Sequence, residues 1–136
     1  MKTTISLLTA VLVFALQSGA QCPVNTVLVS GRVNNPVPHS KVRVRLLYPK
    51  GKAGESGEIT IDEGSFRIPL EFLTAQNSVL TNLPKRCGRK PQSVEIILLE
   101  NDKEADRVTL DFAKDFKVAD LSAYTLRSDL VLNGSH

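Results

Sequence analysis

Hydrophobic and polar residues alternate with a period of two along most of the chain after residue 23. The clearest run spans 41–46, where Lys, Arg and Arg alternate with Val, Val and Leu. Successive side chains of a β-strand point to opposite faces of the sheet, so this run predicts a strand with one buried and one solvent-exposed face. No window has the period of a long helix, and the best helix candidates are short turns within 71–83 or 115–121.

Further strands are predicted wherever similar short runs recur, at 24–33, 58–62, 65–70, 94–99, 107–112 and 124–132. Gly31 predicts a bulge in the first of these runs, and Pro69 indicates a sheet edge or a strand end because proline lacks the backbone N–H. The run 94–99 becomes apolar on both faces, which is typical of a strand covered on both sides. Turn-rich segments at 34–36, 51–57, 62–64 and 83–84 separate the runs. The sequence therefore predicts an all-β fold, an antiparallel β-sandwich of seven to eight strands, transthyretin-like or immunoglobulin-like.

The first twenty residues have the pattern of a secretory signal peptide. Lys2 gives a basic start, an uncharged apolar run covers 5–16, and small residues end the segment at Ala20. The apolar run has about 12 residues, whereas a membrane-spanning helix needs about 20. We therefore expect residues 1–20 to be removed, residues 21–136 to form a single domain, and the product to be secreted and extracellular, with no membrane span.

Cys22 and Cys87 are the two cysteines of the chain. In an oxidising compartment two thiols of a small domain usually pair, so we expect one disulfide between them; two free buried thiols are the alternative. The bridge would close a loop of about 65 residues. Because it restricts the unfolded chain, it would raise the free energy of unfolding by roughly 3–4 kcal/mol.

Composition narrows the classes of function. The formal net charge is only +3, Trp is absent and aromatic residues make up 5% of the chain. Nucleic acid is therefore not expected as a partner, because such binding needs a larger positive charge and stacking aromatic rings.

Catalytic and metal-binding patterns are scarce. His39 lies in a proline-flanked turn and His136 is the last residue, so neither is placed to serve a rigid catalytic triad. The acidic stretch 100–106 lacks the EF-hand pattern and is expected to be a solvated hairpin loop, with a loose calcium site as the alternative. A pair of carboxylates for hydrolysis would have to be assembled from different strands, for instance from Glu58, Asp62, Glu95 or Asp111. We expect no enzyme activity, metal or cofactor.

A basic loop, 84–91, is the clearest local charge feature. Its four cations surround Cys87, and three further cations alternate along one strand; the candidate binding residues are Lys85, Arg86, Arg89, Lys90, Lys41, Arg43 and Arg45. They would bind an anionic or acidic partner, and the alternative is ordinary surface charge. The pair at 85–86 could also be a processing site. Asn133 begins the one glycosylation sequon, 133–135.

Three short motifs resemble the opening of transthyretin-like and carboxypeptidase-regulatory-like sandwiches. They are Ser30-Gly31-Arg32-Val33, Val42-Arg43-Val44-Arg45-Leu46, and Thr60 through Gly64-Ser65-Phe66. The resemblance covers about residues 28–70 and implies a β-sandwich beginning with these strands. Ile61 stands where those families usually have Asp.

The chain as a whole is also similar in type to small secreted effector or elicitor proteins of filamentous fungi. That similarity implies virulence-related action on a host's proteins and no catalytic residues. The leading hypothesis is accordingly a secreted, non-enzymatic interaction protein that binds a host or other extracellular protein. The alternatives are a module that binds anionic polysaccharide or lipid through the loop 85–90, and a small hydrolase.

Overall fold

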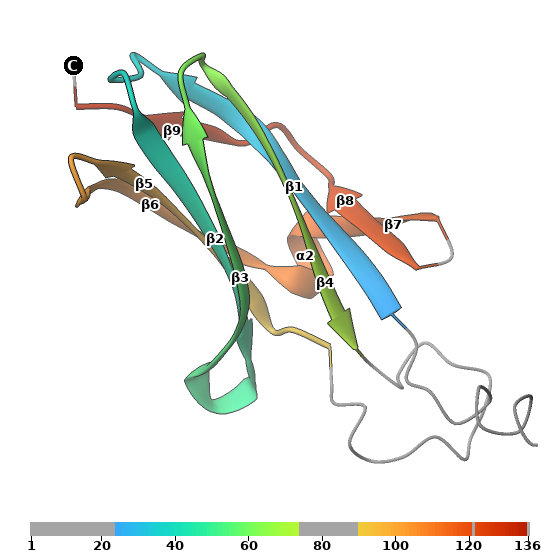
Figure 1. Cartoon of the computed structure of the whole chain (residues 1–136). Coiled ribbons are helices and arrows are strands. Elements are labelled where there is room, and N and C mark those ends of the chain that lie inside the picture. The colour runs from blue at the N-terminus through green and yellow to red at the C-terminus, as the bar shows by residue number, and fades with distance from the viewer. Residues whose placement is uncertain (1–23, 74–89, 121, 136) are drawn as a thin grey trace, which may run out of the picture. The chain divides into compact units, whose positions relative to one another are not determined.

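The alternating runs form strands in two sheets. The computed structural model describes residues 24–73, 90–120 and 122–135, and within these residues there are nine strands. Four antiparallel strands make sheet B, in the order β3 (Lys52–Ile61), β2 (Ser40–Tyr48), β5 (Ser93–Glu100) and β6 (Lys103–Asp111). A short 3-10 turn, η1 (Pro49–Gly51), joins β2 to β3. Figure 1 shows these elements along the chain.

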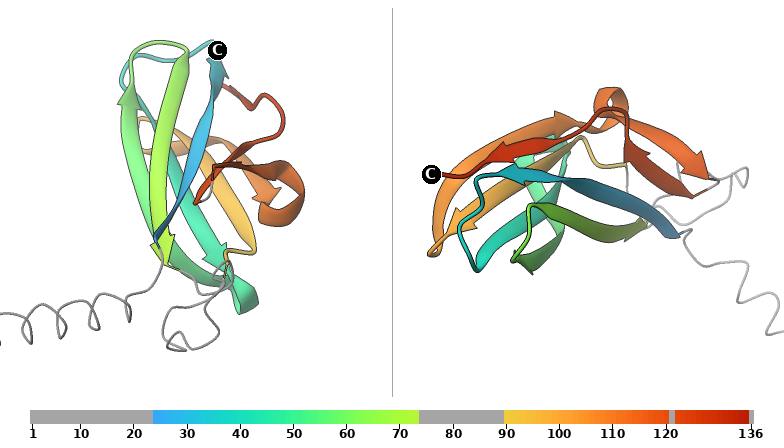
Figure 2. Two further views of the ribbon diagram at one scale, coloured as in Figure 1. Left: turned by 90° about the vertical axis from the view of Figure 1, so that its right-hand side faces the viewer. Right: turned by 90° about the horizontal axis from the view of Figure 1, so that it is seen from above.

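Sheet A has five strands and is mixed. Its order is β4 (Ser65–Leu73), β1 (Val24–Asn34), β8 (Ala123–Leu126) and β7 (Phe116–Asp120), and β9 (Val131–Asn133) also pairs with β1. Both β8 and β9 run parallel to β1, which corrects the expectation of a purely antiparallel sandwich. Parallel pairing is possible because no hairpin connects β1 to β8 or β9. Between β1 and β8 the chain passes through sheet B, and it crosses back to sheet A after β6 (Figure 2).

The core lies between the two sheets and is mostly aliphatic. Every valine, leucine, isoleucine and phenylalanine side chain that points inward from β1, β2, β4 or β5 is buried. An aromatic cluster closes one part of it, where the ring of Phe72 meets those of Phe112 and Tyr124 at centroid distances of 5.8 and 6.1 Å. The predicted all-β sandwich is thus confirmed, and its stability follows from the burial of these apolar side chains.

The predicted number of strands and the predicted helix positions were wrong. The predicted run 124–132 is divided into β8 and β9, and Phe116–Asp120 is strand β7 where a helical turn was expected. A single helical turn, α2 (Phe112–Asp115), comes just before it. Strand β3 also begins at Lys52 and runs through the predicted turn 51–57. Residues 71–73 of the other helix candidate belong to β4, and the rest of that candidate lies outside the described residues.

Two tight connections join consecutive strands. Residues 62–64 join β3 to β4, which run side by side in Figures 1 and 2 although they belong to different sheets. Asn101 and Asp102 join β5 to β6 and have φ angles of 51° and 63°. Positive φ at both central residues is the mark of a type I′ hairpin turn, which Asn and Asp tolerate well. Pro69 lies in β4, an edge strand of sheet A, as predicted from its missing N–H.

Tyr48 at the end of β2 provides a pH-dependent test of this fold. Its hydroxyl donates a hydrogen bond of 2.6 Å to Glu55 Oε2. Burial of the ring raises the pKa of Tyr48, and the hydrogen bond to Glu55 and the negative charge of Glu55 raise it further. Because the folded-state pKa lies above the unfolded one, this group's stabilisation is complete below the usual tyrosine pKa of about 10 and is lost as the pH rises through the folded value.

We expect the tyrosinate of Tyr48 to form at higher pH than free tyrosinate does. The measurement is the ultraviolet difference between alkaline titrations of the wild type and of Tyr48→Phe. Glu55→Gln should bring the pKa of Tyr48 back toward its usual value, whereas Glu63→Gln, on the exposed 62–64 turn, should leave it unchanged. An ordinary titration of Tyr48 in the wild type would contradict the contact with Glu55.

Candidate functional site

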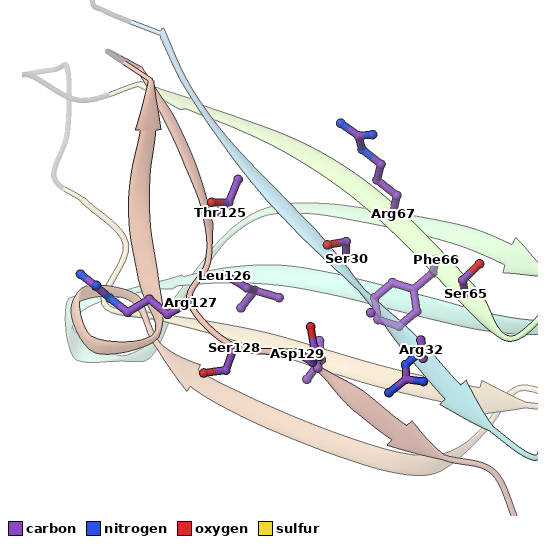
Figure 3. Close-up of a pocket in the computed structure, with 12 residues that line it drawn as sticks. Ser30, Arg32, Ser65, Phe66, Arg67, Thr125, Leu126, Arg127, Ser128 and Asp129 are labelled. Carbon is purple, nitrogen blue, oxygen red and sulfur yellow. The ribbon is translucent and has the colours of Figure 1, made fainter.

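A break in the pairing along β1 forms a recess in sheet A. The register of β1 with β8 ends at Leu28 opposite Thr125, and that with β9 resumes at Arg32 opposite Val131. Three residues of β1, 29–31, therefore face five residues, 126–130, of the returning chain. The longer segment loops away from β1 and leaves a recess of about 470 Å³ (Figure 3). This volume is in the range of pockets that hold ligands.

Polar side chains surround the recess. Hydroxyl groups come from β1, β4, β8 and the looped segment, at Ser30, Ser65, Thr125 and Ser128. Asp129 supplies one carboxylate. The lining also includes three arginines, Arg32, Arg67 and Arg127, all of which are exposed residues.

The apolar floor of the recess explains why a glycine occupies β1 at this point. Gly31 faces inward, and a Cβ built on it would lie 2.7 Å from the carbonyl oxygen of Leu130 and 2.8 Å from the Phe66 ring. The sequence predicted a bulge in β1 at Gly31, but β1 is continuous and the irregularity lies in the strand that pairs with it. The glycine is required because the buried side chain of Phe66 and the chain at Leu130 approach the β1 backbone closely.

Backbone and side-chain bonds fix the looped segment from its other side. The amide of Arg127 donates to the carbonyl oxygen of Asp115 over 2.9 Å, and its Nε donates to the carbonyl oxygen of Phe116 over 3.1 Å. Both acceptors lie where α2 ends and β7 begins. Phe112 and Phe116 hold this junction in the aromatic cluster, with a ring separation of 5.6 Å. The outer wall of the recess is thus anchored to the core through α2.

The cap of α2 is therefore expected to stabilise the recess wall. Asp111 precedes the helix, and its carboxylate accepts a hydrogen bond of 2.9 Å from the amide of Lys114. Asp111→Ala removes this acceptor and should lower the free energy of unfolding by about 0.5–2 kcal/mol. Asp111→Asn keeps an acceptor and should stay close to the wild type. Denaturant unfolding of the three proteins measures the difference, and equal losses in both variants would show that the cap is unimportant.

The arginines of the described residues divide by sheet. Arg43, Arg45 and Arg107 lie on sheet B, and each has a carboxylate partner at 2.9 Å or less. On sheet A, by contrast, no described carboxylate lies within 4.0 Å of the nitrogens of Arg32, Arg67 or Arg127. Asp129 likewise has no ion pair with a described residue. The uncompensated arginines therefore gather around the recess.

The predicted basic stripe of β2 lies on the outer face of sheet B and is neutralised there. Lys41 is 3.9 Å from Glu58 and 3.6 Å from Asp102. Arg43 contacts Glu58 at 2.8 Å, and Arg45 contacts the buried Glu95 at 2.6 Å. The structure thus brings all three predicted cations to one face, but their charges are offset by neighbouring acids.

The same ion pairs explain the apolar pattern of β5. Glu95 also accepts from Arg107 over 2.9 Å, and Arg107 in turn contacts Glu104. The hydrogen bond to Glu104, together with the negative charges of Glu95 and Glu104, raises the pKa of Arg107. The long side chains lie beside Ile97 and Leu99 in the register and bury them. The strand predicted to be covered on both sides is covered outside by charged side chains instead of a second layer.

Most of the predicted basic loop cannot be placed. Lys85, Arg86 and Arg89 lie outside the described residues, as do Cys22 and Cys87 with their predicted disulfide and the predicted signal peptide. Lys90 is described, and its Nζ lies 5.7 Å from the centroid of the Tyr124 ring, in the geometry of a cation–π contact. Binding by this loop stays a prediction.

The carboxylates considered for hydrolysis are held apart by separate partners. Glu58 and Glu95 belong to the ion pairs of sheet B, and Asp111 caps α2. Asp62 lies 3.5 Å from His39 in an exposed pair between two turns. Within the described residues no group of three His, Cys, Asp or Glu side chains is arranged to hold a metal ion.

The acidic stretch 100–106 was expected to be a solvated hairpin loop, but only Asn101 and Asp102 form the turn. Glu100 is buried at the end of β5, and residues 103–106 already belong to β6, because the two strands pair up to the turn. The acids of this stretch have different partners. Glu100 accepts hydrogen bonds from the amide and hydroxyl of Ser135, and Asp106 accepts one of 2.8 Å from the amide of Asn133. The sequon at Asn133 therefore lies in and just after β9, with its serine hydroxyl bound to Glu100. Glycosylation at Asn133 stays a prediction.

No helix in the described part of the chain is long and apolar enough to span a bilayer. Comparison of the chain with protein-family models, with curated proteins and with solved structures finds no match. The recess and the distribution of charge around it are therefore the basis for inferring function.

Proposed function

We propose that this chain is a secreted, non-enzymatic interaction protein that binds a host or other extracellular protein through the outer face of sheet A. The observation that carries the proposal is the recess at 126–130, surrounded by three arginines without carboxylate partners. Charged side chains that are offset by neighbours contribute little to a partner, whereas uncompensated ones remain available for complementary charge.

Two further features support a binding role. The recess is formed by a looped segment on a rigid sheet, and binding residues often lie on loops that a scaffold positions. Its wall is anchored by two hydrogen bonds from Arg127 and by the aromatic cluster, so the site is preorganised. The predicted signal peptide and the similarity in type to small secreted effectors favour a partner outside the producing cell.

The test compares retention of extracellular proteins on three immobilised forms of the chain. One is the wild type. The recess variant carries Arg32→Gln and Arg67→Gln, and it keeps Arg127 because its Nε anchors the recess wall. The control variant carries the same charge change elsewhere, at Lys50→Gln and Lys103→Gln, both exposed residues outside the recess lining.

The expected result is a protein that the wild type and the control variant retain and that the recess variant loses. Circular dichroism and denaturant unfolding of the recess variant exclude loss of the fold. The proposal fails if no protein is retained differentially, or if the recess variant retains the same proteins as the wild type.

A further inference from the structure

Resting on the proposed function, we infer that the recess of sheet A recognises an acidic, extended peptide segment of the partner protein, with several carboxylates spaced along it. A second cavity, of about 60 Å³, lies against the same looped segment. The charge, the spread and the chemistry of the lining each bear on the identity of the occupant.

The charge of the lining favours an anionic group. Three arginines and a single aspartate line the recess, and none of the four has an ion pair with a described residue. On sheet B the arginines are paired with Glu58, Glu95 and Glu104. Carboxylates thus neutralise the arginines of sheet B, whereas the arginines around the recess of sheet A have no such partner among the described residues. Arginine is also the residue best suited to bind a carboxylate with two hydrogen bonds.

The spread of the arginines favours several carboxylates over one compact anion. In Figure 3, Arg32, Arg67 and Arg127 extend from three different sides of the recess, and their guanidinium groups point away from its centre and from one another. A single phosphate in the middle would not be reached by all three. A segment that crosses the recess and continues beyond its rim can place one acidic side chain at each of them.

The remaining polar groups suit a peptide backbone. Ser30, Thr125 and Ser128 offer hydroxyl groups that donate and accept hydrogen bonds, and Asp129 offers an acceptor. A peptide presents backbone N–H donors to Asp129, whereas an ionised phosphate presents mainly acceptors. The carboxylate of Asp129 points into the recess in Figure 3.

Polysaccharide and lipid fit the lining less well. The one aromatic side chain of the recess, Phe66, is buried and forms part of the floor, so no exposed ring is available to stack on a sugar. The exposed large apolar side chains of the described residues are Val24, Leu73 and Val118, and none lines the recess. The concave, polar recess therefore has no exposed large apolar side chain that could insert into a membrane.

The experiment titrates the purified, secreted protein with defined probes. The probe is a short synthetic peptide of alternating glutamate and serine, and its neutral counterpart has glutamine in place of glutamate. Oligogalacturonate, phosphatidylglycerol vesicles and inorganic phosphate test the other sources of negative charge. Calorimetry gives the affinity, and amide resonances of Ser30, Ser128 and Asp129 report whether the recess is the site.

We expect the glutamate peptide to bind, to shift those resonances and to lose affinity as salt is added, and the glutamine peptide not to bind. Arg67→Glu should weaken binding about tenfold, because one exposed attraction is lost and a repulsion of similar size replaces it. Lys103→Glu makes the same charge change on sheet B and should leave the affinity nearly unchanged.

The inference is overturned if the glutamate peptide does not shift the recess resonances, or if oligogalacturonate, vesicles or phosphate bind there more tightly than it does. It is also overturned if Lys103→Glu weakens binding as much as Arg67→Glu. The two proposals fail separately: a protein that only the recess variant loses, together with a glutamate peptide that does not bind, would support the proposed function and refute an acidic segment.

Discussion

Phe72→Ala is expected to lower the free energy of unfolding by about 3–5 kcal/mol, the usual cost of removing a fully buried aromatic ring. Phe72 is 1% exposed at the inner face of β4. Its ring packs edge-on against Phe112 at 5.8 Å and obliquely against Tyr124 at 6.1 Å. The alanine leaves a cavity that these two rings can fill only by moving the α2 junction and β8.

The matched control is the next residue of the same strand. Leu73 is 48% exposed, and Leu73→Ala should change the stability by about 0.5 kcal/mol or less. Denaturant unfolding followed by circular dichroism compares both variants with the wild type. Small domains are commonly stable by about 5–15 kcal/mol. The Phe72→Ala protein will therefore either unfold at a clearly lower denaturant concentration or be unfolded without denaturant. Equal effects at both positions would mean that β4 does not face the core as described.

Gly31→Val is expected to be the second most destabilising change, by about 1–3 kcal/mol. Even the first added carbon would lie 2.7 Å from a backbone oxygen of Leu130 and 2.8 Å from Phe66. The oxygen belongs to the main chain of the looped segment and cannot rotate away. The substitution must therefore push the segment or the ring outward, which also deforms the recess.

Ser30→Val provides the control for Gly31→Val. It adds the same side chain to the adjacent position of β1, where the residue is exposed and faces outward. This variant should unfold within about 0.5 kcal/mol of the wild type. A Gly31→Val protein that unfolds at the same denaturant concentration as the wild type would contradict the close approach of Leu130 and Phe66.

The strands were predictable because their signal is local. Alternation at 41–46 and 65–70 marks which side chains are buried, and the structure buries Val42, Val44, Ile68 and Leu70. The two-faced apolar pattern of β5 was read correctly, but its cause was not. Ile97 and Leu99 are covered by long side chains from the two neighbouring strands, β2 and β6. The order of strands in a sheet cannot be predicted from the pattern of one strand alone.

The recess was not predictable for a related reason. The run 124–132 looks like one strand, and only the polar pair Ser128 and Asp129 within it hinted at an interruption. Its division into β8 and β9 follows from a parallel return to β1, with Arg127 bound to the α2–β7 junction where the pairing with β1 is interrupted. Non-local pairing of this kind cannot be read from periodicity.

The choice of binding residues shows the same limit. Clustering along the sequence pointed to Lys41, Arg43 and Arg45, which sheet B pairs with acids. Arg32 and Arg67 are isolated in the sequence and become neighbours of one recess only through folding. A cation is available to a partner according to what lies beside it in space, and this is fixed by the register of strands that are distant in sequence.

The most direct test of a binding face on sheet A is site-specific photo-crosslinking in extracellular fluid. A photoreactive amino acid replaces Ser128 at the recess in one protein and Lys103 on sheet B in another; both positions are exposed. The expected result is a covalent adduct with a partner protein from position 128 and none from position 103. Adducts of equal yield from the two positions, adducts from position 103 alone, or no adduct from position 128 would contradict it.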